Sequence, residues 1–328
     1  MPQRRLAPLI ALLLAGALCA IALALKAGDI NASWGQLWVA LLPGGDPALS
    51  AVIRELRLPR AIAAFACGGL LATAGALMQV LLRNPLADPY ILGISGGAAV
   101  AALGAITLGA ATFWVDASAF AGALTAMVVV FGLAHGDGSW TQTRLLLTGV
   151  IVAAGCGAAV SLMLALAPDT RVMSMLFWMM GDASAAAQPW PAVGVLALAL
   201  VVVMPFARDL NVLARGELTA RALGVRVGHL RIALYVLASL LTATSVTLVG
   251  SVGFVGLIVP HLVRLVLGND QRVLIPAAAL AGGTLLTLAD TAARTVMAPQ
   301  QLPVGVLTAL IGVPVFLFLL SRNPRSAR

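Results

Sequence analysis

The stretch RDLNVLARGELTARALGVRVGHLR, residues 208–231, decides the fold, because it is the longest polar interruption in a chain of apolar runs. Its spacing predicts two short helices, with Asp209 capping the first, Gly216 ending it and Gly224 ending the second. Its arginines outnumber Asp209 and Glu217, and basic segments stay on the cytoplasmic side of a membrane. The stretch therefore predicts a cytoplasmic element that docks another protein, although a plain loop between two spans also fits it.

The composition around this stretch is that of a membrane protein. Hydrophobic residues make up 61% of the chain and charged residues 10%, with a mean hydropathy of +1.03, whereas a soluble domain carries about a quarter charged residues. The net charge of +8 lies mostly on arginines between apolar runs, where it meets lipid headgroups, so we expect no nucleic-acid binding. Cys19, Cys67 and Cys156 fall inside apolar runs without metal-ligand spacing, which predicts buried thiols and no metal site.

Ten apolar runs have the length of membrane spans or come close to it. They cover residues 6–25, 58–82, 91–111, 118–135, 144–166, 191–207, 231–250, 254–267, 273–292 and 303–321. The eighth is short and contains Pro260, His261 and Arg264, so we expect a broken or partly re-entrant helix there. The pattern predicts an all-α, polytopic helical membrane protein with about ten transmembrane helices, forming a single domain over residues 1–328.

The distribution of basic residues orients the chain, since an even number of spans puts both termini on one side. If that side is the cytoplasm, it receives 208–231 and the terminal residues Arg4, Arg5, Arg325 and Arg328. The outer side then receives Lys26, Arg54, Arg57, Arg60, Arg171 and Arg294. This asymmetry favours cytoplasmic termini.

Arginines crowd the start of the second run, at Arg54, Arg57 and Arg60. Cations are disfavoured at the positive end of a helix dipole, so an external anionic partner would relieve their cost, but phospholipid headgroups would do so equally well. Further along the same run, Gly68, Ala72 and Ala76 form a ridge of small residues on which another helix can pack closely.

The segment after the second run cannot be a continuous helix, because Pro85 and Pro89 interrupt it. Irregular backbone at a membrane face must be buried in protein or line water. A constriction around Asn84 and Leu86 satisfies that condition, and so does an ordinary tight turn. In the Met-rich segment before the sixth run, Met175, Met179 and Met180 indicate adaptable packing or, less simply, contact with a bulky apolar ligand.

The chain contains one lysine, Lys26, and it does not stand in a GxxxxGK[ST] sequence. ATP therefore cannot bind through a P-loop of this chain, and ATP-driven transport would need a separate ATPase that docks on residues 208–231. The three histidines, His135, His229 and His261, are scattered without partners at catalytic spacing, so we expect no enzyme activity. An ion-coupled secondary transporter is the alternative; it would need buried paired acids, and Asp290 is the carboxylate near membrane depth in the later spans.

Several motifs, in order and across nearly the whole chain, resemble the permeases of type II ABC importers, the FecCD family. They are RLPRAIAA, GALMQVLLRNPLADPYILGISGGAA, RLLLTGV, FWMMGD, GELTARALGV, GFVGLIVPHLVRLVLG and LPVGVLTALIGVPVFLFLL. The resemblance implies the type II importer fold and uptake of a metal chelate, which is haem, a ferric siderophore or cobalamin, across the bacterial inner membrane.

The resemblance also implies partners and site residues. Partners are a second copy of the chain, two ATPase subunits that bind ATP and Mg, and a substrate-binding protein; this chain itself holds no cofactor. The implied sites are a cytoplasmic gate at Asn84 and Leu86 with Thr141, Gln142, Thr143 and Leu146 opposite, ATPase coupling at Gly216, Glu217, Ala220, Arg221, Leu223 and Gly224, and binding-protein docking at Arg57, Arg60 and Arg294. Gln142 is bulkier than the small hydroxyl residues expected at such a gate.

Overall fold

A computed structural model describes residues 6–28, 33–42, 45–135, 141–184, 186 and 188–322. Over these residues the protein is built from helices without strands, which confirms the all-α prediction. Each predicted run contains a helix: α1 (Leu6–Lys26), α4 (Leu58–Leu81), α5 (Ile94–Thr107), α6 (Thr112–His135), α7 (Gln142–Leu166), α9 (Trp190–Val203), α12 (Val227–Val249), α13 (Val255–Leu267), α14 (Gln271–Thr295) and α15 (Val304–Arg322). In the described part of the chain, seven helical stretches are long and apolar enough to cross a membrane, and α5, α13 and α15 are shorter apolar helices.

Further helices and helical turns lie between the predicted runs or at their ends. These are α2 (Trp34–Leu41), α3 (Pro47–Ala51) and α8 (Asp169–Met180), together with the π-helical turn η2 (Val52–Arg57) and the 3-10 turns η3 (Pro89–Leu92) and η4 (Met204–Phe206). A capping box explains where α2 begins, since the Ser33 hydroxyl accepts from the Gln36 N–H and the Gln36 side chain accepts from the Ser33 N–H. α3, η2 and α4 form one uninterrupted helical stretch, so the second span is longer than its apolar run predicts.

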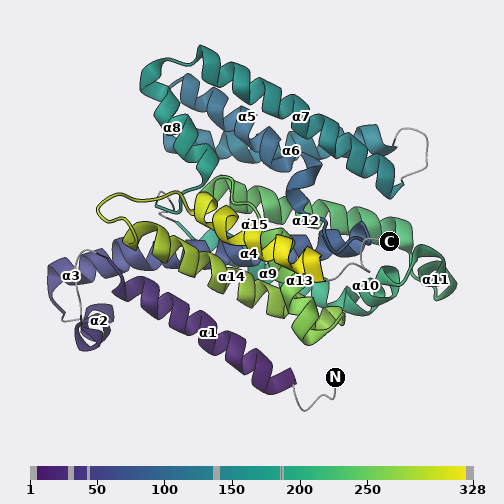
Figure 1. Ribbon diagram of the computed structural model, residues 1–328, viewed down its shortest axis with the longest axis horizontal. Helices are drawn as coiled ribbons and strands as arrows, with labels where there is room; N and C mark the ends of the chain where they lie inside the picture. The colour runs from purple at the N-terminus through teal and green to yellow at the C-terminus, as the bar shows by residue number, and fades with distance from the viewer. Residues whose placement is uncertain are drawn as a thin grey trace.

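α4 is the central helix of the bundle, and every residue from 66 to 81 is buried. It packs against α14, α12 and α13 (Figure 1). The contacts depend on small residues: a Cβ added at Gly68 would lie 2.2 Å from the Gly282 carbonyl oxygen, and one added at Gly75 would lie 1.9 Å from that of Gly256. The predicted ridge of small residues is therefore the surface on which α14 crosses α4.

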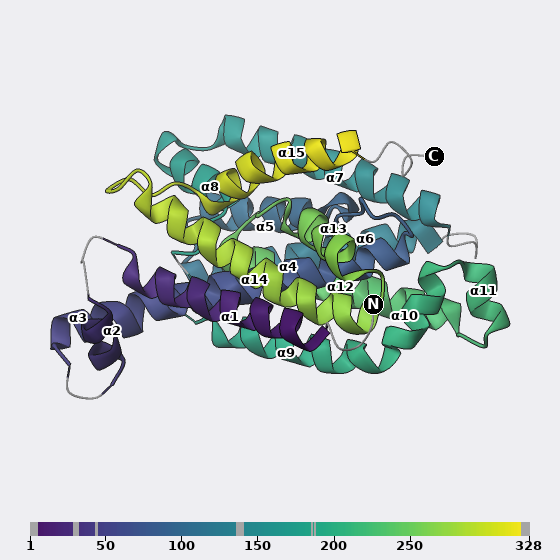
Figure 2. The same ribbon diagram turned by 60° about the horizontal axis from the view of Figure 1, so that its bottom comes forward.

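The two ends of the bundle carry different elements. α2 and α3 lie at one end and the short helices α10 (Ala207–Ala214) and α11 (Glu217–Ala222) at the other, while α1 lies along α14 on one flank (Figures 1 and 2). α1 begins and α15 ends toward the α10–α11 end. Arg4, Arg5, Arg325 and Arg328, which contributed to the predicted orientation, lie outside the described residues.

α5 and α13 are too short to cross a bilayer, since 14 and 13 helical residues span roughly 20 Å of a core about 30 Å thick. Their starting segments meet inside the bundle, where the Ser95 and Ser251 hydroxyls are 3.1 Å apart and the Val252 N–H donates to the Tyr90 hydroxyl over 3.1 Å. α13 is continuous through Pro260, so the eighth span is short, as predicted, but is not broken at that proline.

Candidate functional site

The polar stretch that opened the sequence folds into α10 and α11, as predicted, and Gly216 separates them. Gly216 has φ +133° and Gly224, after α11, has φ +81°, which are backbone conformations that favour glycine. The predicted cap is wrong: α10 begins at Ala207 as a continuation of α9 and η4, so Asp209 lies inside its first turn instead of capping it. An apolar run that leads directly into the helix leaves no separate start for Asp209 to cap.

The charged side chains of α11 form ion pairs within the protein, whereas leucine side chains at this helix are exposed. Glu217 Oε1 is 2.7 Å from Arg221 Nη2, and Glu217 Oε2 is 3.3 Å from Arg231 Nη1 at the start of α12. Ala220 is fully buried, whereas Leu218 is 85% exposed and Leu223 is 66% exposed. The Glu217 contact with Arg231 thus ties α11 to α12, and Leu218 in α11 and Leu223 directly after it are left unburied at the end of the bundle.

The predicted gate residues lie on two segments that touch within this one chain. Gln142, in the first turn of α7, donates through Nε2 to the Leu81 carbonyl over 3.0 Å and accepts from Arg83 Nη2 over 3.1 Å. On the α4 side, the Asn84 side chain accepts from the Leu86 N–H over 2.9 Å. The bulky Gln142 therefore fastens the start of α7 to the end of α4.

The remaining gate residues have separate structural roles. Thr141 caps α7 by accepting from the Arg144 N–H over 3.2 Å, and Leu146 packs against the main core. Thr143 is exposed. That these residues form a gate stays a prediction.

Arg60 lies beside a buried carboxylate at the opposite end of the bundle. Its Nε lies 3.1 and 3.0 Å from the two Asp290 oxygens, and its Nη2 lies 2.9 Å from Asp290 Oδ1. Gln301 accepts from Nη1 over 3.0 Å, and Asp182 lies 3.8 Å away. Asp290 is 2% exposed, so its charge is matched by a bidentate arginine and is not available as part of a paired-acid proton relay.

Arg57 and Arg294 hold the carboxyl end of α1. Arg57 Nη1 donates to the Leu25 carbonyl over 2.9 Å and the Lys26 carbonyl over 3.2 Å. Arg294 donates to the Ala27 carbonyl over 3.0 Å and also to that of Ala24, and its Nε lies 3.9 Å from Asp290. Cations near a helix C-terminus satisfy its last carbonyls and oppose the negative end of its dipole.

These contacts change the expectation that the arginines at the start of the second run need an external anion. Arg54, Arg57 and Arg60 all find carbonyls or a carboxylate within the chain, so no external anion is needed to offset their crowding. The role of Arg57, Arg60 and Arg294 in docking a binding protein stays a prediction. Sequence reasoning missed Gln301 and Asp182; the signal available was Asp290 itself, because a carboxylate in an apolar run needs a cationic partner.

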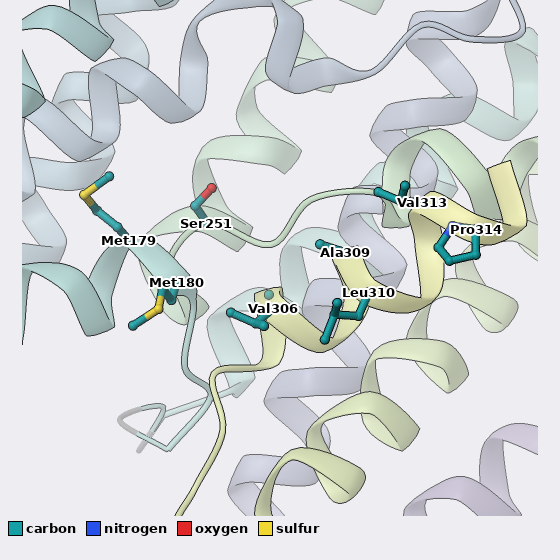
Figure 3. A pocket seen from close by; sticks show the side chains of 9 residues that line it. Met179, Met180, Ser251, Val306, Ala309, Leu310, Val313 and Pro314 are labelled. Carbon is teal, nitrogen blue, oxygen red and sulfur yellow. The ribbon is translucent and has the colours of Figure 1, made fainter. Parts of the chain in front are cut away.

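An apolar cavity of about 520 Å³ lies between the end of α8, the turn after α12 and the first half of α15. Figure 3 shows its lining side chains, which come from three separate segments: Met179, Met180, Ser251, Val306, Ala309, Leu310, Val313 and Pro314. Gly305 also lines it, and a Cβ there would lie 2.4 Å from the Met180 carbonyl oxygen, so only glycine permits this approach of α15 to α8.

The sequence left two interpretations open for the methionines of the α8 segment, packing and contact with a bulky apolar ligand, and different methionines fit each. Met175 is fully buried as packing, whereas Met179 and Met180 face the cavity. The Ser251 hydroxyl, which pairs with that of Ser95, adds a polar group to an otherwise apolar lining. Such a surface suits a bulky, largely apolar ligand, because flexible thioethers adapt to irregular shapes.

Known proteins match this chain over most of its length. The model of the FecCD transport family matches residues 12–322. The cobalamin import system permease protein BtuC of Halobacterium salinarum is 43% identical over 88% of this chain and 79% of its own. The hemin transport system permease protein HmuU of Yersinia pestis is 38% identical over 90% of each chain. A solved structure described as an inward-facing conformation of a putative metal-chelate type ABC transporter superposes with a TM-score of 0.87 and 30% identity, covering 96% of this chain and 99% of that one.

Proposed function

Because this chain belongs to the FecCD transport family and is an ABC importer permease, we propose that it carries a metal chelate to the cytoplasm under the power of separate ATPase subunits. The observation that carries this proposal is the pair of exposed leucines in and directly after α11, in a chain without a P-loop. Solvent-exposed leucines at the end of a membrane bundle are the kind of apolar anchor that a partner protein buries. The family membership sets aside the ion-coupled secondary transporter.

The ATPase would meet the bundle at α11. Leu218 and Leu223 would enter a groove of the ATPase, while the Glu217 contact with Arg231 would transmit its movement to α12. Two ATPase subunits, one for each copy of the permease, would bind ATP and Mg. This assignment places the α10–α11 end and both termini in the cytoplasm, in agreement with the distribution of arginines.

A second copy of the chain would cover the apolar surface of α7. In the described structure, α7 buries only Leu145, Gly149 and Val160 among its 25 residues. α15 likewise exposes Leu310, Val313 and Leu317. In a homodimer that joins these helices, the Met179 and Met180 cavity would open onto a path between the two copies.

The cavity and the relatives support the proposed cargo class. Cobalamin, haem and ferric siderophores are bulky, and relatives carry the names of cobalamin, vitamin B12 and hemin permeases. An apolar, methionine-lined wall would let such a ligand pass without binding it tightly. A substrate-binding protein would supply the selectivity by docking at the α2–α3 end, near Arg57, Arg60 and Arg294.

Reconstitution tests the proposal. The chain should be assembled with its ATPase in vesicles, with the binding protein on the outside, and supplied in turn with cobalamin, hemin and a ferric siderophore. We expect uptake of one of them that needs ATP and survives collapse of the proton gradient by an ionophore. Uptake by the permease without any ATPase would overturn the proposal.

Replacing Leu218 and Leu223 with serine separates the coupling role from transport in general. Both side chains are exposed, so the variant should fold, bind the binding protein and fail to retain the ATPase. Wild-type uptake by this variant would contradict the coupling assignment.

A further inference from the structure

A second cavity, of about 540 Å³, lies at the α10–α11 end of the bundle and is polar. It is formed by the last turn of α4, by α10, and by the turn between α13 and α14. Three arginines line it, Arg83, Arg215 and Arg264, and Asp270 is the one carboxylate among the lining residues. No role assigned so far to α11 or to the methionine-lined cavity uses these side chains.

The positive charge of this cavity is not balanced within the described structure. The guanidinium groups of Arg215 and Arg264 have no hydrogen bond or ion pair with any described residue, and the one side-chain hydrogen bond of Arg83 within the described structure goes to the neutral Gln142 side chain. Asp270 instead accepts from Asn211 Nδ2 over 2.8 Å and from the Arg272 N–H over 3.1 Å. The lining therefore carries an excess of positive charge.

Partial enclosure makes this imbalance unfavourable at Arg264. This residue lies on α13, where Val263 and Leu267 beside it are buried, and is itself partly exposed, whereas Arg83 and Arg215 are exposed. A guanidinium that is partly enclosed without a counter-ion loses part of its solvation. An anion that enters the cavity would recover part of that loss and would contact Arg83 and Arg215 as well.

The position of the cavity indicates which anion. It lies where α4 and α13 end and α14 begins, at the level where lipid headgroups meet a membrane protein, and basic pockets between helix ends bind phosphate-bearing headgroups. A guanidinium matches phosphate geometry with two parallel N–H donors. We propose that Arg83, Arg215 and Arg264 form a binding site for a phosphate-type anion, the chemistry shared by an anionic phospholipid headgroup and free phosphate.

The test uses the full chain in nanodiscs. Its thermal unfolding is measured in phosphatidylcholine, in phosphatidylcholine with phosphatidylglycerol, and in phosphatidylcholine with inorganic phosphate in solution. The site variant is Arg215→Gln with Arg264→Gln. The matched control is Arg208→Gln with Arg226→Gln, which removes the same charge from exposed arginines outside the cavity.

We expect phosphatidylglycerol to raise the unfolding temperature of the wild type and the control by several degrees, and that of the site variant by much less. Stabilisation by inorganic phosphate alone, lost in the same variant, would also support the site and would identify free phosphate as its ligand. Equal stabilisation of all three proteins would overturn the proposal.

Two further measurements keep the test decisive. Native mass spectrometry should show phosphatidylglycerol retained by the wild type at least tenfold more than by the site variant. If the double variant does not fold, Arg215→Gln alone, at an exposed position, serves for the same comparison. Unchanged retention of lipid and phosphate, combined with loss of ATPase assembly, would show that the cavity accepts an acidic protein side chain instead and would overturn the phosphate site.

Discussion

Replacing Asp290 with asparagine should destabilise the permease more than any other single charge removal discussed above. Asp290 is 2% exposed and holds Arg60, whose side chain is 12% exposed, through both carboxylate oxygens. Removing one partner of a buried ion pair leaves the other charge uncompensated, at a cost of about 3–5 kcal/mol. Asp182, at 3.8 Å from Arg60, offsets part of this loss, so we expect the lower end of that range.

Cys67 provides the assay. It is 0% exposed, so in a background with Cys19→Ser and Cys156→Ser its reaction with a maleimide dye reports unfolding. Thermal and denaturant midpoints in nanodiscs then give the difference in free energy of unfolding. Asp169→Asn is the matched control, because Asp169 is exposed and its loss removes only a helix-dipole interaction of at most about 1 kcal/mol.

The double variant Arg60→Met with Asp290→Leu tests the mechanism of the loss. Without either charge of the pair, Arg60 is no longer left uncompensated, and Arg294 loses its 3.9 Å contact with Asp290 but keeps the Ala27 carbonyl, so most of the stability should return. A loss below about 1 kcal/mol in Asp290→Asn, or a double variant less stable than Asp290→Asn, would refute the assignment of Arg60 and Asp290 as a mutually dependent buried pair.

Three other perturbations test separate parts of the structure. Gly75→Ala places a Cβ 1.9 Å from a carbonyl oxygen and should cost roughly 1–3 kcal/mol, whereas Gly132→Ala, with open space around it, should be neutral or stabilising in the same unfolding assay. Leu218→Ser should weaken copurification of the ATPase without lowering the unfolding temperature, because the side chain is exposed; retention of the ATPase at wild-type levels would contradict its role as an anchor. Burial raises the pKa of Asp88 to about 6, so the folded protein holds this proton more tightly than the unfolded chain, and raising the pH from 5 to 7 should cost about 1 kcal/mol of stability. Asp88→Asn should remove that part of the pH dependence, and an unaltered pH profile would show that Asp88 does not supply it.

The sequence predicted the helices that a hydrocarbon environment requires. A backbone in hydrocarbon must satisfy its own hydrogen bonds, so each long apolar run had to be helical, and the glycines at 216 and 224 marked the ends of the two short helices. Gly68 and its neighbours likewise indicated a close helix crossing, which α14 supplies.

Pairings between distant segments could not be predicted in the same way. The crowded arginines suggested an external partner, but Arg60 finds Asp290 at a separation of 230 residues, and no local pattern encodes which face of α14 turns toward α4. Asp209 failed as a cap for a local reason, because η4 joins α9 to α10 without a break. Ser95 contacts Ser251 where the two short helices α5 and α13 begin, and the sequence predicted a short helix only for α13.

The hydrogen bonds that Arg57 and Arg294 donate to the carbonyls of α1 have a consequence for biogenesis. α1 is synthesised long before α14, since Arg294, which donates to the Ala27 carbonyl, follows 267 residues later. Until α14 is inserted, the last turn of α1 lacks that donor, and the flank along α14 is also uncovered. Chains truncated before α14 would therefore present a loosely held first helix to the proteases of membrane quality control, and release of a full-length chain would coincide with its protection.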